Sequence, residues 1–109
     1  MEMTRALYDL AFSIVIVEPY RNRRILRDHH IYFEPSSDYS TLEIESKVRE
    51  LHDKIKADIG KRFGKDGLVV KSLERKADVP KKIEIKREDG DWILTTAGVI
   101  LKDNNVYKI

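Results

Sequence analysis

One stretch of the chain, residues 40–63, has the hydrophobic pattern of an amphipathic helix. Ser40 and Glu43 have the spacing of a capping box, in which each side chain binds a backbone N–H at the helix start. Gly60 and Gly64 are the candidate stops at the other end. We therefore predict one long helix that lies with an apolar face on a sheet. The apolar positions recur at steps of three and four, which keeps them on one face: Ile44, Val48, Leu51, Ile55, Ile59 and Phe63.

Two segments before this helix have the pattern of strands. In the first, at about residues 9–18, a run of apolar β-branched residues is typical of a strand that is central in a sheet or covered on both faces. In the second, at about 24–33, Ile25 and Phe33 share one face with His29. A turn at 18–23 between them predicts an antiparallel hairpin. Residues 1–10 fit either a helical turn or the beginning of the strand.

The pattern after the helix predicts several short strands. A loop at 74–80 ends in proline, and the Asp-Gly pair at 89–90 indicates a hairpin turn. Residues 103–105 form a last tight turn between two terminal strands. We predict one α+β domain, residues 1–109, in which a mainly antiparallel sheet of about four to six strands packs on one central helix, in the order ββαβββ. The strands after the helix are expected at about 68–73, 82–86, 92–96, 99–101 and 106–109.

The composition narrows the class of protein. The chain has 109 residues and no cysteine, which excludes disulfides, thiolate catalysis and cysteine-ligated metal sites. It contains no apolar run of about 18 residues, the minimum for a membrane span, and no secretory signal. We therefore expect a cytoplasmic protein. Charged residues make up 37% of the chain although the net charge is only +2, and with the absence of glutamine this resembles the composition of thermophile proteins.

The stretch YFEPSSDYSTLEIESKVRELHDKI, residues 32–55, resembles the passage of ubiquitin-like β-grasp proteins in which the second strand leads into the helix. This resemblance implies a β-grasp-like fold and a role in docking to other proteins. Those members of the family that act as modifiers or sulfur carriers end in a diglycine tail. This chain ends in Asn-Val-Tyr-Lys-Ile, so conjugation and sulfur transfer are not expected.

No residue set in the chain has the spacing of a catalytic, cofactor-binding or metal-binding motif. His29 and His30 are adjacent, so they point to opposite faces of a strand, and His52 lies on the helix without an H-x-x-x-H partner. The chain has neither a nucleophile elbow nor a glycine-rich phosphate loop. We expect no cofactor and no metal, and predict no catalytic residue.

A basic cluster lies in the first hairpin. It could contact phosphates and stack on a base, as the ribbons of nucleic-acid-binding proteins do. The other interpretation is that the arginines keep the hairpin soluble and prevent its edges from pairing with the sheet of another molecule. The cluster consists of Tyr20, Arg21, Arg23, Arg24 and Arg27.

The two terminal strands offer a second candidate surface. An apolar sheet edge there could accept a strand of another protein or of a second copy of the chain, whereas the alternative is ordinary core packing. Taken together, the residues predict a non-catalytic binding module that docks on protein, as a homodimer or complex subunit. Nucleic-acid binding is the alternative, and a small enzyme or accessory subunit the third. The docking residues would be Val99, Leu101, Val106, Tyr107 and Ile109.

Overall fold

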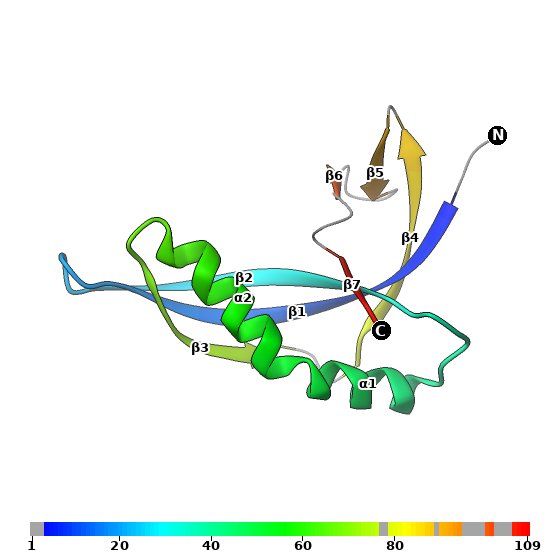
Figure 1. Ribbon diagram of the computed structural model, residues 1–109, viewed down its shortest axis with the longest axis horizontal. Coiled ribbons are helices and arrows are strands. Elements are labelled where there is room, and N and C mark those ends of the chain that lie inside the picture. Colours follow the sequence, from blue (N-terminus) through cyan, green and yellow to red (C-terminus); the bar gives the residue numbers. More distant parts are fainter. Residues whose placement is uncertain (1–3, 77–78, 89, 95–99, 102–105) are drawn as a thin grey trace.

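The computed structural model of the protein describes residues 4–76, 79–88, 90–94, 100–101 and 106–109. These residues form an α+β domain with a mostly antiparallel sheet, as predicted, and two helices pack on that sheet (Figure 1). The elements are β1 (Thr4–Glu18), β2 (Arg23–Glu34), α1 (Thr41–Glu50), α2 (His52–Gly64), β3 (Val69–Arg75), β4 (Lys81–Glu88), β5 (Asp91–Leu94), β6 (Ile100–Leu101) and β7 (Val106–Lys108).

The strand β1 is the centre of the sheet. It pairs with β2 along one edge, and with β3 and then β4 along the other, so β3 and β4 act as one interrupted strand. The order across the sheet is β6-β5-β4-β1-β2-β7, with β3 beside β1. Its start at Thr4 shows that residues 4–10 of the ambiguous N-terminal segment belong to the strand rather than to a helical turn, while residues 1–3 lie outside the described residues. The apolar β-branched run therefore belongs to a central strand, as its pattern indicated.

The β1–β2 hairpin follows the predicted alternation. Ile16 lies opposite Ile25, and Tyr8 lies opposite Phe33. The turn closes with a hydrogen bond from the backbone N–H of Arg21 to the carbonyl oxygen of Glu18, 3.3 Å long. Asn22 has a φ of 50°, a left-handed conformation that asparagine adopts more readily than most residues.

The main core lies between one face of the sheet and the helices. Alternate residues of β1 point toward the helix layer, and α1 and α2 each contribute a pair of buried aliphatic side chains. Burial of these apolar surfaces is the main stabilising term of the fold. The buried members are Leu10, Phe12, Ile14, Ile16, Ile31, Phe33, Ile44, Val48, Ile55, Ile59 and Leu73.

A second, smaller core lies on the opposite face, near the beginning of β1. Leu7, Ile85 and Trp92 are buried there, and Tyr32 and Val106 pack against them. The guanidinium group of Arg5 lies 4.8 Å from the Trp92 ring centroid and is also hydrogen-bonded to the carboxylate of Glu34. The sheet therefore has buried side chains on both faces at this end.

Two predictions about the elements are wrong. The expected single helix is two helices, because the backbone of Leu51 departs from helical geometry (φ −88°, ψ −4°) between α1 and α2. The two terminal strands do not pair with each other, because β6 pairs with β5 while β7 lies parallel to β2. The expected turn at 103–105 lies outside the described residues.

In the described part of the chain, neither helix is long and apolar enough to cross a membrane.

Candidate functional site

The tip of the β1–β2 hairpin, residues 18–24, consists almost entirely of exposed residues. It extends past the end of α2 at one end of the molecule, whose longest dimension is 51 Å (Figure 1). Tyr20 lies in this turn with 98% of its surface exposed. No described residue covers its ring, so both faces of the ring are free to stack on a flat partner.

All four arginines that the sequence singled out are exposed and lie at or next to the hairpin tip. Arg23 lies opposite Glu18, Arg24 opposite Val17, and Arg27 opposite Ile14, so the guanidinium groups occupy both faces of the ribbon. Arg21 makes only a loose ion pair with Glu18, at 3.8 Å between Nε and Oε2, and its side chain remains 75% exposed. An exposed pair of this length contributes little to stability, so Arg21 can turn to another anion.

Lys71 joins this cluster although the sequence pattern did not indicate it. The register between β1 and β3 shifts so that Val70 faces Ile16 and Ser72 faces Val15, which leaves Lys71 as the extra residue of a bulge. A bulge redirects the side chain of its extra residue. Lys71 thereby lines a shallow hollow of about 340 Å³ together with Val17, Asn22, Arg23 and Arg24.

The other side of the tip is less basic. A hollow of about 410 Å³ lies there between the hairpin turn and the α2–β3 turn, and Glu18 and Asp66 are among the residues that line it. Tyr20 and Arg21 also border this hollow. The hollow that Arg23, Arg24 and Lys71 line has, in contrast, no carboxylate among its described lining residues.

The second set of predicted site residues lies mostly against the protein interior. Val106 packs on the second core, whereas Tyr107 and Ile109 pack on the main core. The backbone of Leu101 pairs with Trp92 between β5 and β6. Val99 lies outside the described residues. The structure therefore separates these residues, which the sequence grouped in one terminal strand pair.

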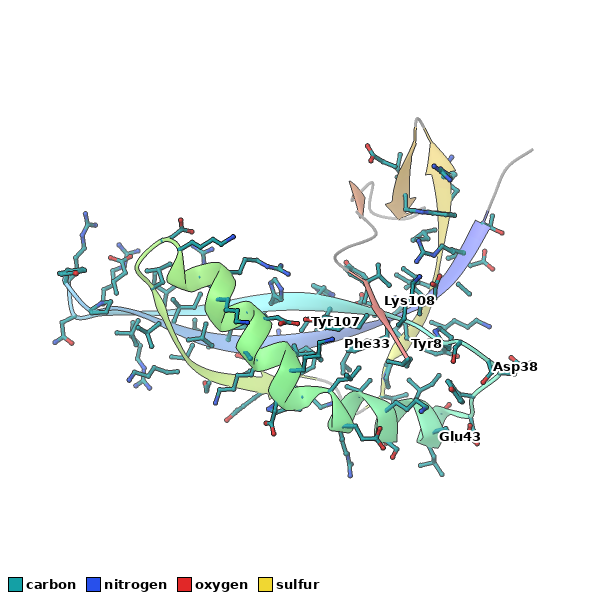
Figure 2. All side chains as sticks on the ribbon, viewed as in Figure 1. Tyr8, Phe33, Asp38, Glu43, Tyr107 and Lys108 are labelled. Carbon is teal, nitrogen blue, oxygen red and sulfur yellow. The ribbon has the colours of Figure 1, made fainter. Side chains whose placement is uncertain are left out.

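Tyr107 is fixed by contacts with both the sheet and α2. Its ring centroid lies 5.9 Å from that of Phe33, and the two residues are neighbours in Figure 2. Its hydroxyl group donates a hydrogen bond of 2.9 Å to Oδ2 of Asp58. Burial, the hydrogen bond to Asp58 and the charge of that carboxylate raise the pKa of Tyr107 to about 12, so the hydroxyl stays protonated at neutral pH.

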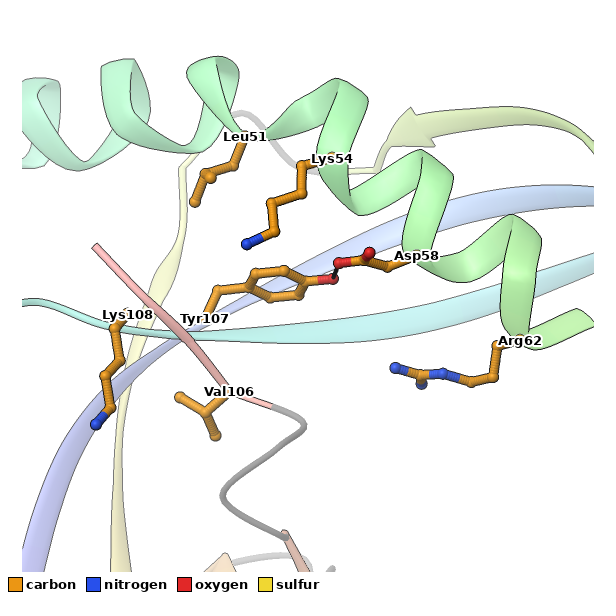
Figure 3. A pocket seen from close by; sticks show the side chains of 7 residues that line it. All are labelled: Leu51, Lys54, Asp58, Arg62, Val106, Tyr107 and Lys108. Carbon is orange, nitrogen blue, oxygen red and sulfur yellow. Dashed lines mark hydrogen bonds between the residues drawn. The ribbon is translucent and has the colours of Figure 1, made fainter.

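A hollow of about 440 Å³ lies beside Tyr107, between β7 and α2 (Figure 3). Figure 3 shows the hydroxyl of Tyr107 directed at Asp58, while Lys54 and Arg62 extend from α2 on either side of that carboxylate. The three β7 residues border the hollow from below α2. This arrangement is a candidate binding site for an anionic group, because its charged side chains are mostly basic.

His29 and His30 point to opposite faces of β2, as adjacent strand positions require. His29 faces the helix layer, where burial, the charge of Arg62 and that of His30 lower its pKa. His30 faces the other way, with Nδ1 at 2.8 Å from Oδ1 of Asp9. The described residues contain no group of three or more side chains that could hold a metal ion.

No family model matches the chain, and comparisons with curated proteins and with solved structures find no match. The function therefore has to be inferred from the geometry of the hairpin tip and of the region around β7.

Proposed function

We propose that the protein binds nucleic acid through the tip of the β1–β2 hairpin. The observation that carries the proposal is the position of Tyr20, which is almost fully exposed at the hairpin tip and has basic side chains near it. Scattered exposed apolar residues are common on protein surfaces and need no explanation. An uncovered aromatic ring beside exposed guanidinium groups has the composition of a single-strand binding surface.

The roles of the residues follow from their chemistry. Arg23, Arg24 and Lys71 surround one hollow, where they would contact backbone phosphates, since guanidinium and ammonium groups both pair with phosphate oxygens. Tyr20 would stack on an unpaired base. A duplex offers phosphates but no free base face, so single strands are the preferred ligand of this arrangement.

The test is binding of labelled single-stranded and duplex oligonucleotides at about 50 and 200 mM salt. The double variant Arg23→Ala/Arg24→Ala should weaken binding and lower the slope of log K against log salt by roughly 0.7 to 0.9 for each cation removed. The control is Arg49→Ala/Lys56→Ala, which removes the same charge from exposed positions on the helices and should leave both quantities unchanged.

Tyr20→Ala separates stacking from charge. It should weaken single-strand binding by about 1–3 kcal/mol without changing the salt slope, while Tyr20→Phe should retain the affinity. Absence of binding at the lower salt would contradict the proposal. Equal losses in the tip variant and its control would also contradict it, because they would make binding a property of net charge alone.

Docking to another protein is a second candidate function, and the resemblance of residues 32–55 to ubiquitin-like proteins also implies it. This function rests on a different surface, the region around β7. It is favoured by the unpaired edge of that strand in the described part of the chain.

A further inference from the structure

The strand β7 has one edge that pairs with no other strand in the described part of the chain. It is the last strand of the sheet order and lies parallel to β2. The backbone N–H of Ile109 donates to Glu34 and its carbonyl oxygen accepts from Ser36, at 2.9 and 2.7 Å. Because the backbone groups of successive strand residues alternate in direction, Val106 and Lys108 turn theirs away from β2. These groups form a short template for an added strand.

Two hollows lie along this edge. The larger, of about 440 Å³, is bordered by α2 and by all three residues of β7. The smaller, of about 250 Å³, is bordered by the end of α1 and by Lys108 and Ile109. Leu51 and Lys108 line both, so the two hollows adjoin each other beside the strand edge, and we call them together the β7 groove. Side chains from both faces of β7 reach it, which places the groove against the edge rather than under one face.

The charges of the β7 groove select the ligand. Its basic side chains are Lys47, Lys54, Arg62 and Lys108, whereas its acidic ones are Glu50 and Asp58. One carboxylate oxygen of Asp58 already accepts the hydrogen bond from Tyr107. The groove therefore carries an excess of positive charge beside the apolar side chains of Leu51, Val106 and Ile109.

We propose that the β7 groove binds an extended acidic segment of a partner protein, which adds as a strand to the free edge of β7. The backbone groups of Val106 and Lys108 pair with the added strand. Successive side chains of a strand point to opposite faces, so one alternate set, the carboxylates, faces Lys54 and Arg62 on the helix side. The other set, which is apolar, lies beside Val106 on the side of Lys108. A nucleic-acid strand would satisfy the cations but lacks the amide spacing that a strand edge pairs with.

The probe is a set of labelled, terminally blocked peptides of about six residues, the usual length of a strand, in which valine alternates with glutamate. A matched set carries lysine in place of glutamate. Fluorescence anisotropy should detect binding of the glutamate peptides alone. Lys54→Glu/Arg62→Glu should weaken that binding by at least about tenfold, since like charges would then face each other.

A pair of substitutions at Lys108 tests strand addition separately from charge. Lys108→Pro removes both the charge and the outward N–H, while Lys108→Gln removes only the charge. The contacts of Ile109 with β2 do not involve this N–H, so the sheet should keep its register in both variants. We expect Lys108→Pro to bind the glutamate peptides more weakly than Lys108→Gln, with unchanged circular dichroism for both.

Four results of the peptide experiments would overturn the proposal: no binding of any glutamate peptide, equal binding of the lysine set, equal affinities of the two Lys108 variants, or displacement of the peptide by a single-stranded oligonucleotide. The last would make the groove part of a nucleic-acid surface.

Self-association that Lys108→Pro abolishes would also overturn the proposal, because the occupant would then be a second copy of the chain. Arg23→Ala/Arg24→Ala should leave peptide binding unchanged, so the two proposed functions can fail independently.

Discussion

Tyr107 is the single residue that most directly links the last strand to the helices. Its hydroxyl group is hydrogen-bonded to Asp58, and its pKa is raised to about 12, first by burial and then by that carboxylate. Ionisation is therefore harder in the folded protein than in the unfolded chain, where the pKa of tyrosine is about 10. The resulting stabilisation is complete below about pH 10 and is lost as the pH rises from about 10 to 12.

We predict that Tyr107→Phe lowers the free energy of unfolding by about 1 kcal/mol at neutral pH, since the hydrogen bond to Asp58 is lost. The variant should also lose less stability than the wild type between about pH 10 and 12. Urea unfolding at a series of pH values measures both effects. The pKa of Tyr32 is also raised, by burial and then by the charge of Asp9, but Tyr32 contributes equally to the alkaline loss of stability in the variant and the wild type. An identical alkaline loss in variant and wild type would contradict the assignment.

Tyr20 and Lys71 both belong to the cluster at the hairpin tip, but the sequence predicts this position only for Tyr20. Tyr20 lies beside proline and arginines in a turn, so its exposure and its basic neighbours follow from the local pattern. Lys71 belongs to a different strand and reaches the same cluster through a bulge. Its neighbours in sequence carry no sign of this, because the bulge results from the pairing of β3 with β1.

Among the helices and strands, α1 has the clearest local signal. Ser40 is its N-cap, and the Oγ atom accepts a hydrogen bond of 3.3 Å from the backbone N–H of Glu43. This confirms one half of the predicted capping box. The hydrogen bond satisfies a backbone donor that has no partner within the helix.

We predict that Ser40→Ala lowers the free energy of unfolding by about 0.5–2 kcal/mol. Ser46→Ala is the matched control, because it makes the same chemical change at an exposed position inside α1, where alanine is the better helix former. Thermal and urea unfolding measure the difference. Equal effects of the two substitutions would show that the N-cap does not contribute to stability.

The protein as a whole is held together by two cores that share the strand β1. Leu7 and Leu10 are both almost fully buried, but Leu7 belongs to the second core and Leu10 to the main core beneath the helices. Trp92, the only tryptophan of the chain, lies in the second core. Its fluorescence therefore reports on that core, while far-ultraviolet circular dichroism reports mainly on the helices.

We predict that Leu7→Ala and Leu10→Ala each lower the free energy of unfolding by about 2–5 kcal/mol, because each leaves a cavity in a close-packed region. In both variants the fluorescence and circular dichroism transitions in urea should coincide, since a strand common to both cores couples their unfolding. Two separate transitions in Leu7→Ala would instead show that the second core unfolds independently.

Local patterns in the chain were sufficient for much of this architecture. The apolar positions at steps of three and four predicted the helical region, and alternation predicted the faces of β2. Both patterns depend on the backbone repeat of one element, so neighbouring residues contain the information. The basic hairpin tip was identifiable for the same reason, as its arginines follow one another in sequence.

Long-range packing determined the rest. The break between α1 and α2 falls at a leucine, Leu51, and not at a proline or glycine, so the local sequence did not predict it. The break lets each of the two helices bury its own pair of aliphatic side chains. The parallel pairing of β7 with β2 joins segments about seventy residues apart, and it creates the β7 groove. Which strands pair depends on contacts across the whole sheet, so it cannot be predicted from any short stretch of adjacent residues.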